Sequence, residues 1–179
     1  EQSVDSELAK ELIETQFPEL APVSVELFGE GWDNIAYLVN KKFVFRFPRR
    51  QVAVDLIENE HFVLSQIADK LPLPVPNPIF IGKPSTRYAW LFSGYELLLG
   101  STACLMHLTR QERCALAKPL AEFLRALHTI QIDAPEETLG RLDVKTRWPK
   151  VHQNLVHIQH YCPEHEHAAF VWYSDYYLW

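Results

Sequence analysis

The sequence predicts an α+β fold: a five-stranded antiparallel sheet with one large helix, followed by a helical region. Segments that alternate apolar and polar residues recur before Gly100, as half-buried strands do. One long segment among them has the apolar spacing of a helix that packs one face, and after Gly100 the pattern changes to helical spacing. We therefore expect two regions, residues 1–99 and residues 100–179.

The first elements are a short helix and three strands. The helix is expected over residues 7–16, and the alternation places strands over residues 23–27, 35–39 and 43–47. The run 29–34, which contains two glycines, forms the turn between the first two strands. Pro48 ends the third strand, because proline cannot donate to a sheet ladder.

A large helix and two further strands complete the sheet region. Within residues 54–71, apolar residues recur at helical spacing: Leu56, Val63, Leu64, Ile67 and Leu71. The prolines of residues 71–78 exclude a helix and favour an extended course. Strands are expected to follow over residues 78–81 and 88–95, separated by the turn 82–85.

Helices are expected to dominate the second region. The first is predicted over residues 110–130 and a second from about 146 to 160. The first has its apolar residues on one face: Leu116, Leu120, Phe123, Leu124 and Leu127.

Composition excludes several classes of protein. The 179 residues are 47% apolar and 22% charged, as in a globular protein. No apolar stretch of roughly 18 residues is present and the N-terminus is acidic and polar, so we expect no membrane span, no secretory signal and a cytoplasmic location. The net charge of −6 argues against a nucleic-acid partner and is compatible with a cationic ligand.

Cysteine and histidine residues do not predict a disulfide framework or a metal site. The three cysteines, Cys104, Cys114 and Cys162, are irregularly spaced, and we interpret them as reduced thiols. Residues 162–167 combine one cysteine with two histidines, but the spacing matches no usual zinc pattern. We interpret this segment as a histidine-rich loop.

The glycine turn and the third strand hold the first candidate site residues. Gly29 and Gly31 let backbone N–H groups approach an anionic ligand, although a glycine hairpin by itself is more often only a structural turn. Alternation places the phenylalanines of residues 43–47 on one face of the strand and Val44 with Arg46 on the other. If the phenylalanines face the core, Val44 and Arg46 face a cleft beneath the turn.

Glu60 strengthens this interpretation. It lies four residues after Leu56 and four before Leu64, on the apolar stripe of the large helix, where a carboxylate is desolvated unless a cation meets it. Arg46 is the expected partner. A pair of this kind near a glycine turn is the ion pair by which kinases position nucleotide phosphates. A purely structural salt bridge, or a Glu60 that points to solvent, stays open as an alternative.

Five blocks of sequence occur in a defined order and spacing. They are Gly-Glu-Gly-Trp-Asp-Asn-Ile-Ala-Tyr at 29–37, Phe-Arg-Phe-Pro-Arg at 45–49, Leu-Pro-Leu-Pro-Val-Pro at 71–76, Gly-Lys-Pro-Ser at 82–85 and Ala-Leu-His-Thr-Ile at 126–130. In this order and spacing they resemble aminoglycoside phosphotransferases, especially the branch that modifies the 2″ hydroxyl. The resemblance covers residues 23–130 well and the remainder loosely.

The resemblance implies a protein-kinase-like N-lobe followed by the first helices of a helical C-lobe. It also implies an antibiotic-resistance kinase that binds ATP or GTP with magnesium between the lobes and passes a phosphate to an aminoglycoside hydroxyl. On this reading, residues 29–34 cover the phosphates, with Gly29, Gly31 and Asn34 as contacts. Arg46 stands where the family commonly has a lysine, and Glu60 is its partner on the helix.

The same resemblance implies which residues surround the base. Val44 forms the roof of the base pocket, and Tyr95 lies at or next to the gatekeeper that limits its depth. The linker from Glu96 to Leu98 bonds the base edge through its backbone. By analogy with relatives that prefer GTP, a side chain as large as Tyr95 is expected to influence the choice of nucleotide, and both ATP and GTP stay open.

Two features depart from the family pattern. Arginine replaces the common lysine at position 46, and its planar fork binds carboxylate and phosphate differently from an ammonium group. The family's His-x-Asp and Asp-x-Gly/Asp segments, which supply the catalytic carboxylate and the magnesium ligands, are absent from the 179 residues. We therefore assign no catalytic and no metal-binding residue in this chain, interpret it as a truncated product, and expect it to be inactive alone. A non-catalytic pseudo-kinase fragment, or a kinase for a macrolide, choline or another small alcohol, are the alternatives.

Overall fold

The computed structural model describes residues 2–134, 145, 149 and 153. The chain divides into two compact units, Glu1–Ala134 and Pro135–Trp179. All the elements described below belong to the first unit. The lobe boundary expected between residues 99 and 100 stays a prediction.

The sheet has five antiparallel strands, as the sequence predicts, in the order β1-β2-β3-β5-β4. Its central strand is β3, which is buried along almost its whole length. A β-bulge between Leu27 and Gly29 interrupts the pairing of the first two strands. The strands are β1 (Val25–Glu30), β2 (Asn34–Val39), β3 (Phe43–Pro48), β4 (Phe80–Gly82) and β5 (Phe92–Glu96).

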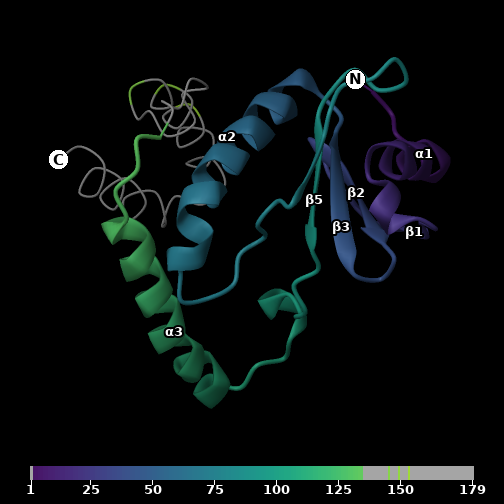
Figure 1. Ribbon diagram of the computed structural model, residues 1–179. Coiled ribbons are helices and arrows are strands. Elements are labelled where there is room, and N and C mark those ends of the chain that lie inside the picture. The colour runs from purple at the N-terminus through teal and green to yellow at the C-terminus, as the bar shows by residue number, and fades with distance from the viewer. Residues whose placement is uncertain (1, 135–144, 146–148, 150–152, 154–179) are drawn as a thin grey trace. The chain divides into compact units, whose positions relative to one another are not determined.

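Two helices lie on opposite sides of the sheet, α1 (Ser6–Gln16) on one and α2 (Gln51–Ile67) on the other (Figure 1). The buried residues of α1, which are Ala9, Leu12 and Ile13, belong to the main hydrophobic core. The phenylalanines at 43, 45 and 47 belong to the same core and are at most 8% exposed. The prediction that these rings face the core is therefore confirmed.

Aromatic rings make up much of this core. Phe47 stacks on Phe92 with ring centroids 4.7 Å apart, and Phe45 stacks on Phe80 at 5.5 Å. Phe17, just after α1, meets Phe80 edge-on at 5.2 Å. Such contacts add to the free energy of burial, so the α1 side of the sheet provides a rigid support for the residues on its other face.

Close ring packing explains two glycines of the sheet. A Cβ atom at Gly94 would lie 2.6 Å from the Phe45 ring, and one at Gly82 would lie 2.2 Å from the Phe92 ring. Both distances are shorter than any real van der Waals contact, so a larger residue at either position would displace a core ring.

The α2 side of the sheet contains a second set of side chains. In the β3–β5 ladder Val44 pairs with Tyr95 and Arg46 with Ser93, so these four residues share one face. Helix α2 covers this face with its own buried residues, which are Ala53, Val54, Ile57 and Ile67.

Several element boundaries differ from the sequence prediction. Strand β1 continues through Gly29 and Glu30, so the turn contracts to residues 31–33. Helix α2 begins at Gln51 and ends at Ile67, where a 3-10 turn replaces the predicted last helical turn.

Strand β5 starts at Phe92, later than the predicted residue 88. The Ser85 hydroxyl oxygen accepts hydrogen bonds from the Arg87 and Tyr88 amides, so these amides serve a turn and not a ladder. The Tyr88 ring is fully buried, and its hydroxyl donates to the Pro48 carbonyl at 2.6 Å.

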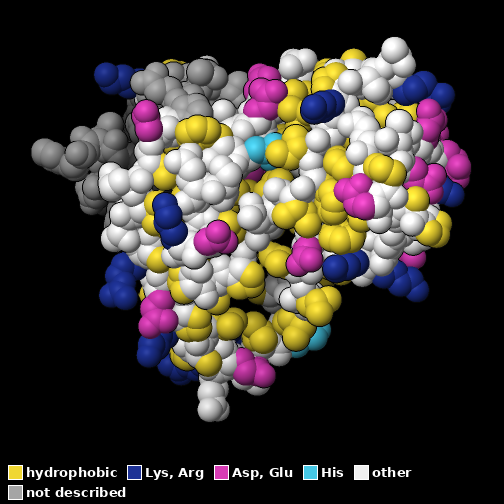
Figure 2. All heavy atoms as spheres, viewed as in Figure 1, with side chains coloured by type: hydrophobic (Ala, Val, Ile, Leu, Met, Phe, Trp, Pro, Cys, Tyr) yellow, Lys and Arg dark blue, Asp and Glu magenta, His cyan; other side chains and the backbone are white. Residues whose placement is uncertain are grey.

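Helix α3 (Arg110–Thr129) agrees with its predicted span to one residue. Three leucines of the predicted apolar face are exposed, and Figure 2 shows apolar side chains on the surface at this end of the first unit. The helix predicted from about 146 to 160 lies almost entirely outside the described residues, as do Cys162 and the histidine-rich segment. Cys114 is a free, exposed thiol. Within the described part of the chain, no helix has the length and apolarity that crossing a membrane requires.

Candidate nucleotide site

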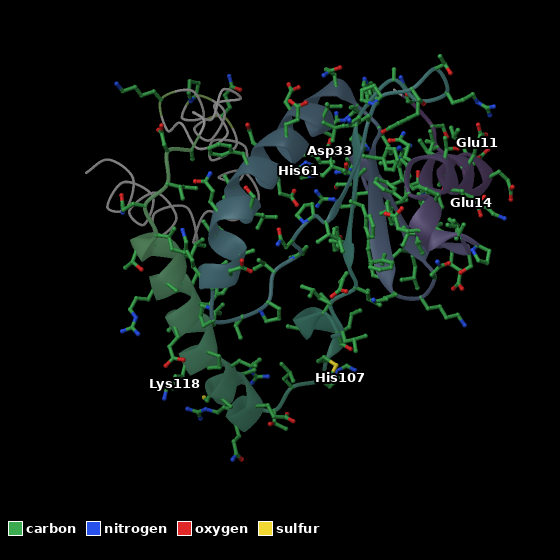
Figure 3. The ribbon with its side chains drawn as sticks, in the orientation of Figure 1. Glu11, Glu14, Asp33, His61, His107 and Lys118 are labelled. Atoms are coloured by element: carbon green, nitrogen blue, oxygen red, sulfur yellow. The ribbon has the colours of Figure 1, made fainter. Side chains whose placement is uncertain are left out.

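The turn between β1 and β2 is attached to the residues that follow β3. Within the turn, the Gly31 amide donates to the Asn34 carbonyl at 2.9 Å. Arg49 forms an ion pair with Glu30 at 2.7 Å and donates to the Gly31 carbonyl at 3.0 Å. Arg50 binds the carboxylate of Asp33 through both Nε and Nη2. The turn is therefore held to the start of α2, close to which Figure 3 labels Asp33.

The outer side of this turn is open. Neither Gly29 nor Gly31 has a positive φ, and among the described residues no atom lies within 4 Å of a Cβ placed at Gly29. Trp32 at the tip is 88% exposed, and a depression of about 460 Å³ is lined by Glu30, Gly31, Trp32 and Arg49. The amides of Trp32 and Asp33 form no hydrogen bond with any described residue. These features leave room and free donors for an anion.

The predicted ion pair between Arg46 and Glu60 is present. Nη2 of Arg46, on β3, donates to Oε2 of Glu60, on α2, at 2.6 Å. The two side chains are 23% and 31% exposed, so the pair is largely shielded from water. The pair thus connects the central strand to α2, as the position of Glu60 on its helix predicted.

The rest of the Arg46 guanidinium group forms no ion pair or hydrogen bond with the described residues. Its Cζ lies 5.9 Å from the centroid of the Tyr95 ring, within the range of a cation–π interaction. Nε is buried and has no hydrogen-bond partner in the described part of the chain. Nη1 forms no hydrogen bond there either and is not among the fully buried atoms. Arg46 therefore keeps a donor that an incoming ligand can reach.

Three other buried polar atoms without a partner occur in the same region: Asn34 Oδ1, His61 Nε2 and Ser93 Oγ. The strand registers place Asn34, Arg46 and Ser93 on the same face of the sheet. His61 follows Glu60 on α2, on the side that faces the sheet in Figure 3. Buried polar groups without partners are rare in proteins and often mark a place where a ligand or water binds.

His61 and Ser93 were missed by the sequence reasoning. Burial lowers the pKa of His61 below its ordinary value, and Arg46 lowers it further, while Glu60 opposes the shift. Burial also raises the pKa of Tyr95, an effect that Arg46 partly offsets. The sequence offers only two local signals for them, a serine within a predicted apolar strand and a histidine next to Glu60, and neither shows that these residues lie near Arg46.

The residues predicted to surround the base lie at the start of β3, at the end of β5 and in the linker that follows β5. Val44 is 1% exposed and Tyr95 is half-buried. Glu96 forms an exposed ion pair with Lys42 at 3.6 Å. Leu97 donates its amide to the Lys42 carbonyl at 2.8 Å, whereas the Leu98 amide has no partner among the described residues. Since Val44 is already covered, its contact with a base requires neighbouring side chains to move.

The described residues hold no group of three or more histidine, cysteine, aspartate or glutamate side chains that would bind a metal ion. Magnesium is commonly held by only one or two carboxylates together with phosphate oxygens and water, so the expected absence of magnesium ligands from this chain stays a prediction. The free nitrogens of Arg46 and the free amides of Trp32 and Asp33 are hydrogen-bond donors, so they suit the oxygens of a nucleotide and not a metal ion.

An open glycine turn above a strand cation that pairs with a helix carboxylate defines the N-terminal lobe of a protein-kinase-like fold. The model of the phosphotransferase enzyme family matches residues 24–176. The chain therefore belongs to this family. No curated protein sequence matches it significantly.

Solved structures agree with this assignment. The complex of APH(2″)-IIIa with GDP and kanamycin is 33% identical over 69% of this chain and 42% of its own, with a TM-score of 0.62. The GDP complex of a point mutant of aminoglycoside 2′-phosphotransferase IIIa is 28% identical over 86% of this chain and 56% of its own, with a TM-score of 0.69. The wild-type GDP complex is 25% identical over 90% of this chain and 52% of its own, with a TM-score of 0.68. The chain thus spans about half the length of these structures.

Proposed function

We propose that this chain is the nucleotide-binding part of a small-molecule kinase that transfers the γ-phosphate of ATP or GTP to a hydroxyl of an aminoglycoside. The observation that carries the proposal is the Arg46–Glu60 pair, in which Nη2 binds the carboxylate at 2.6 Å and Nη1 stays available. A phosphate oxygen accepting from Nη1 would complete a charge-assisted contact. The pair thus has the form that kinases use to place nucleotide phosphates.

The remaining predicted contacts have compatible properties. The free amides of Trp32 and Asp33, near Gly29, Gly31 and Asn34, suit the phosphates. The free Leu98 amide suits a base edge, with Glu96 on the same linker.

Two features support a guanine or adenine nucleotide as the phosphate donor and an aminoglycoside as the acceptor. The relatives at 25–33% identity were solved with GDP, one of them also with kanamycin. The net charge of −6 is compatible with a polycationic acceptor. Tyr95 lies between the base region and Arg46, which makes it the residue to vary when GTP and ATP are compared.

A non-catalytic, nucleotide-binding role of the 179-residue chain is the second candidate, and one observation favours it. The sequence contains no His-x-Asp and no Asp-x-Gly or Asp-x-Asp segment, so the carboxylates that orient an acceptor hydroxyl and hold magnesium in such kinases have no counterpart in it. We expect this chain to bind nucleotide and to transfer no phosphate.

Titration calorimetry of the purified chain with GTP, GDP and ATP tests the nucleotide site. Arg46→Gln should weaken binding about tenfold or more, since a hydrogen bond to a charged group contributes roughly 1.5–3 kcal/mol. Glu58→Gln, on the exposed side of α2, is the matched control and should leave the affinity unchanged. The absence of nucleotide binding by the wild-type chain, or equal affinity of the Arg46→Gln variant, would contradict the proposal.

Phosphate transfer is tested separately. The 179-residue chain should phosphorylate neither kanamycin nor gentamicin, and measurable turnover would exclude the non-catalytic role. Reading the coding sequence downstream of Trp179 for His-x-Asp and Asp-x-Gly/Asp segments decides whether a longer product exists to assay. With such a product, turnover of choline or erythromycin alone would overturn the aminoglycoside assignment.

A further inference from the structure

Two polar side chains near Arg46 are left unexplained by the candidate nucleotide site. Ser93 is the cross-strand neighbour of Arg46 in the β3–β5 ladder, and it is 0% exposed. His61 follows Glu60 on α2 and interacts electrostatically with both Glu60 and Arg46. Ser93 Oγ and His61 Nε2 are buried without a partner in the described part of the chain.

Arg46 Nε is the third unpartnered atom of this group. The three atoms belong to β3, β5 and α2: Ser93 is opposite Arg46 in the strand ladder, and His61 directly follows Glu60 in the sequence. A buried donor or acceptor without a partner loses its hydrogen bonds to water and gains none in the protein. We infer from their placement next to the Arg46–Glu60 pair that the three atoms share a binding partner.

The chemistry of the three atoms defines this partner. Nε–H can only donate, whereas a serine hydroxyl and a neutral imidazole can each donate or accept. An oxygen atom meets all three. Glu60 already balances the charge of Arg46 at 2.6 Å, so the region favours a neutral oxygen over an anion. A buried water typically forms about three hydrogen bonds, which is the number on offer.

We propose that Ser93 and His61 are positioning residues for Arg46: together with Arg46 Nε they hold one water molecule between α2 and the sheet, which fixes the plane of the guanidinium group. With Nη2 on Glu60 and Nε on this water, Nη1 is directed to the nucleotide side of the cleft. The site takes a neutral oxygen, and its function rests on the proposed nucleotide binding.

The proposal explains why arginine stands at position 46, where the family resemblance leads one to expect lysine. A lysine ammonium can pair with Glu60 but has no Nε to reach inward. Substituting lysine would leave Ser93 and His61 without their central donor. Arginine at 46, serine at 93 and histidine at 61 therefore form one interdependent set.

Thermal unfolding of the nucleotide-free 179-residue chain tests the water site itself. Ser93→Ala should lower the midpoint by about 2–6 °C, as loss of a satisfied hydrogen bond does in a protein of this size. If the hydroxyl truly lacks a partner, the same change leaves the midpoint unchanged or raises it, which would overturn the proposal. Ser65→Ala, on the exposed part of α2, is the control and should shift the midpoint by less than about 1 °C.

Coupling to Arg46 is the second measurement. Arg46→Lys should lower the midpoint and the GTP or ATP affinity in the wild-type background, and should have a clearly smaller effect in a Ser93→Ala/His61→Leu background. His61→Gln, which keeps a hydrogen-bonding side chain, should restore part of the coupling that His61→Leu removes. Equal effects of Arg46→Lys in both backgrounds would refute the positioning role.

The outcomes separate this proposal from the proposed function. If the wild-type chain binds no nucleotide, nucleotide binding fails, while the unfolding data still decide whether Ser93, His61 and Arg46 share a partner. If the chain binds nucleotide but Arg46→Lys, Ser93→Ala and His61→Leu act additively, the proposed nucleotide binding stands and the proposed positioning of Arg46 through a water is wrong. A crystal structure should show the water within about 2.7–3.2 Å of at least two of the three atoms.

Discussion

At the scale of single residues, the candidate site depends on how one arginine distributes its donors. Nη2 of Arg46 donates to Glu60 at 2.6 Å, Nε is buried without a partner among the described residues, and Nη1 is not fully buried. A guanidinium group is planar, so fixing two of its nitrogens also fixes the third. This gives Arg46 a defined orientation before any ligand binds, and such preorganisation reduces the entropy lost on binding.

Two glycines provide a contrast between packing and function. Gly94→Ala should lower the free energy of unfolding by about 1–3 kcal/mol, because the added Cβ would lie 2.6 Å from the Phe45 ring. Gly29→Ala should be neutral or stabilising by up to about 1 kcal/mol, since no described atom lies within 4 Å of its Cβ position and its φ is not positive. Chemical denaturation measures both.

The Gly29→Ala variant also tests whether the turn between β1 and β2 binds a ligand. If Gly29 serves phosphate binding, Gly29→Ala should reduce nucleotide affinity while the protein stays as stable as the wild type. A Gly29→Ala variant that binds nucleotide normally would show that the glycine has no part in recognition.

His61 should make stability depend on pH. Burial lowers its pKa below 6.5, so below pH 6.5 the unfolded chain binds a proton that the folded chain does not yet accept. The contribution is fully present above this value and decreases as the pH falls towards the lowered pKa. NMR titration of the imidazole should therefore give a midpoint below 6.5, and His61→Leu should make stability less sensitive to acid in this range. A midpoint at or above 6.5 would contradict the burial of the ring.

Sequence reasoning identified Arg46 and Glu60, but it did not identify Ser93 or His61. Arg46 and Glu60 could be predicted because a carboxylate on the apolar stripe of a helix requires a cationic partner. Alternation along residues 43–47 gave Arg46 as the cation on the face opposite the phenylalanines. Ser93 and His61 become significant only through the β3–β5 register and the rotation of α2. These are tertiary properties that local spacing does not encode.

At the scale of elements, α3 has the most local determinants of its structure. Thr109 accepts from the Glu112 amide at 3.3 Å, and the Glu112 carboxylate accepts from the Thr109 amide at 2.7 Å, which completes a capping box. None of the described residues of α3 is buried. Since packing among the described residues contributes little to this helix, its cap matters more than a cap usually does.

Removing this cap should therefore reduce the helicity of α3. Thr109→Ala should lower the helical signal in far-UV circular dichroism, whereas Thr109→Ser, which caps equally well, should preserve it. The pKa of Glu112 is lowered from 4.5, first by the hydrogen bond from the Thr109 amide and then by that from its hydroxyl. The stabilisation is thus present above pH 4.5 and lost as the pH falls through the lowered pKa. An acid transition of helicity identical in wild type and Thr109→Ala would argue against the capping box.

The accuracy of the predicted elements followed the strength of their local signals. The five strands and α3 were predicted correctly because alternation and helical spacing are local patterns. The start of β5 was wrong, since Tyr88 resembles a strand residue by composition but is held in a turn by Ser85 and in the core by Pro48. The extension of β1 through Gly29 was missed, because a β-bulge depends on the partner strand.

At the scale of the whole molecule, burial can be compared along residues 2–134, and within this range it is concentrated before the end of β5. The buried residues of the main core lie between Val4 and Phe92 in the sequence. The buried residues on the α2 side of the sheet also come before Glu96, the last residue of β5. By contrast, Leu116, Leu120 and Leu124 of α3 are 50%, 54% and 41% exposed. The hydrophobic free energy that stabilises the described part of the chain therefore comes almost entirely from residues before Glu96.

This distribution predicts that residues 1–99 fold without the rest of the chain. A domain of about 100 residues buries enough surface to be stable alone, and the sheet, α1, α2 and the Arg46–Glu60 pair all lie within this range. The shortened chain should unfold in one cooperative thermal transition, with a midpoint within about 5 °C of that of the 179-residue chain. A chain of residues 1–91 is the matched control: it lacks β5, which lies between β3 and β4 in the sheet and supplies Phe92 to the core, and it should not fold. A broad, non-cooperative transition of residues 1–99 would instead mean that α3 is part of the folding unit. The end of the folding unit would then lie nearer Ala134, the last residue of the first compact unit in the sequence.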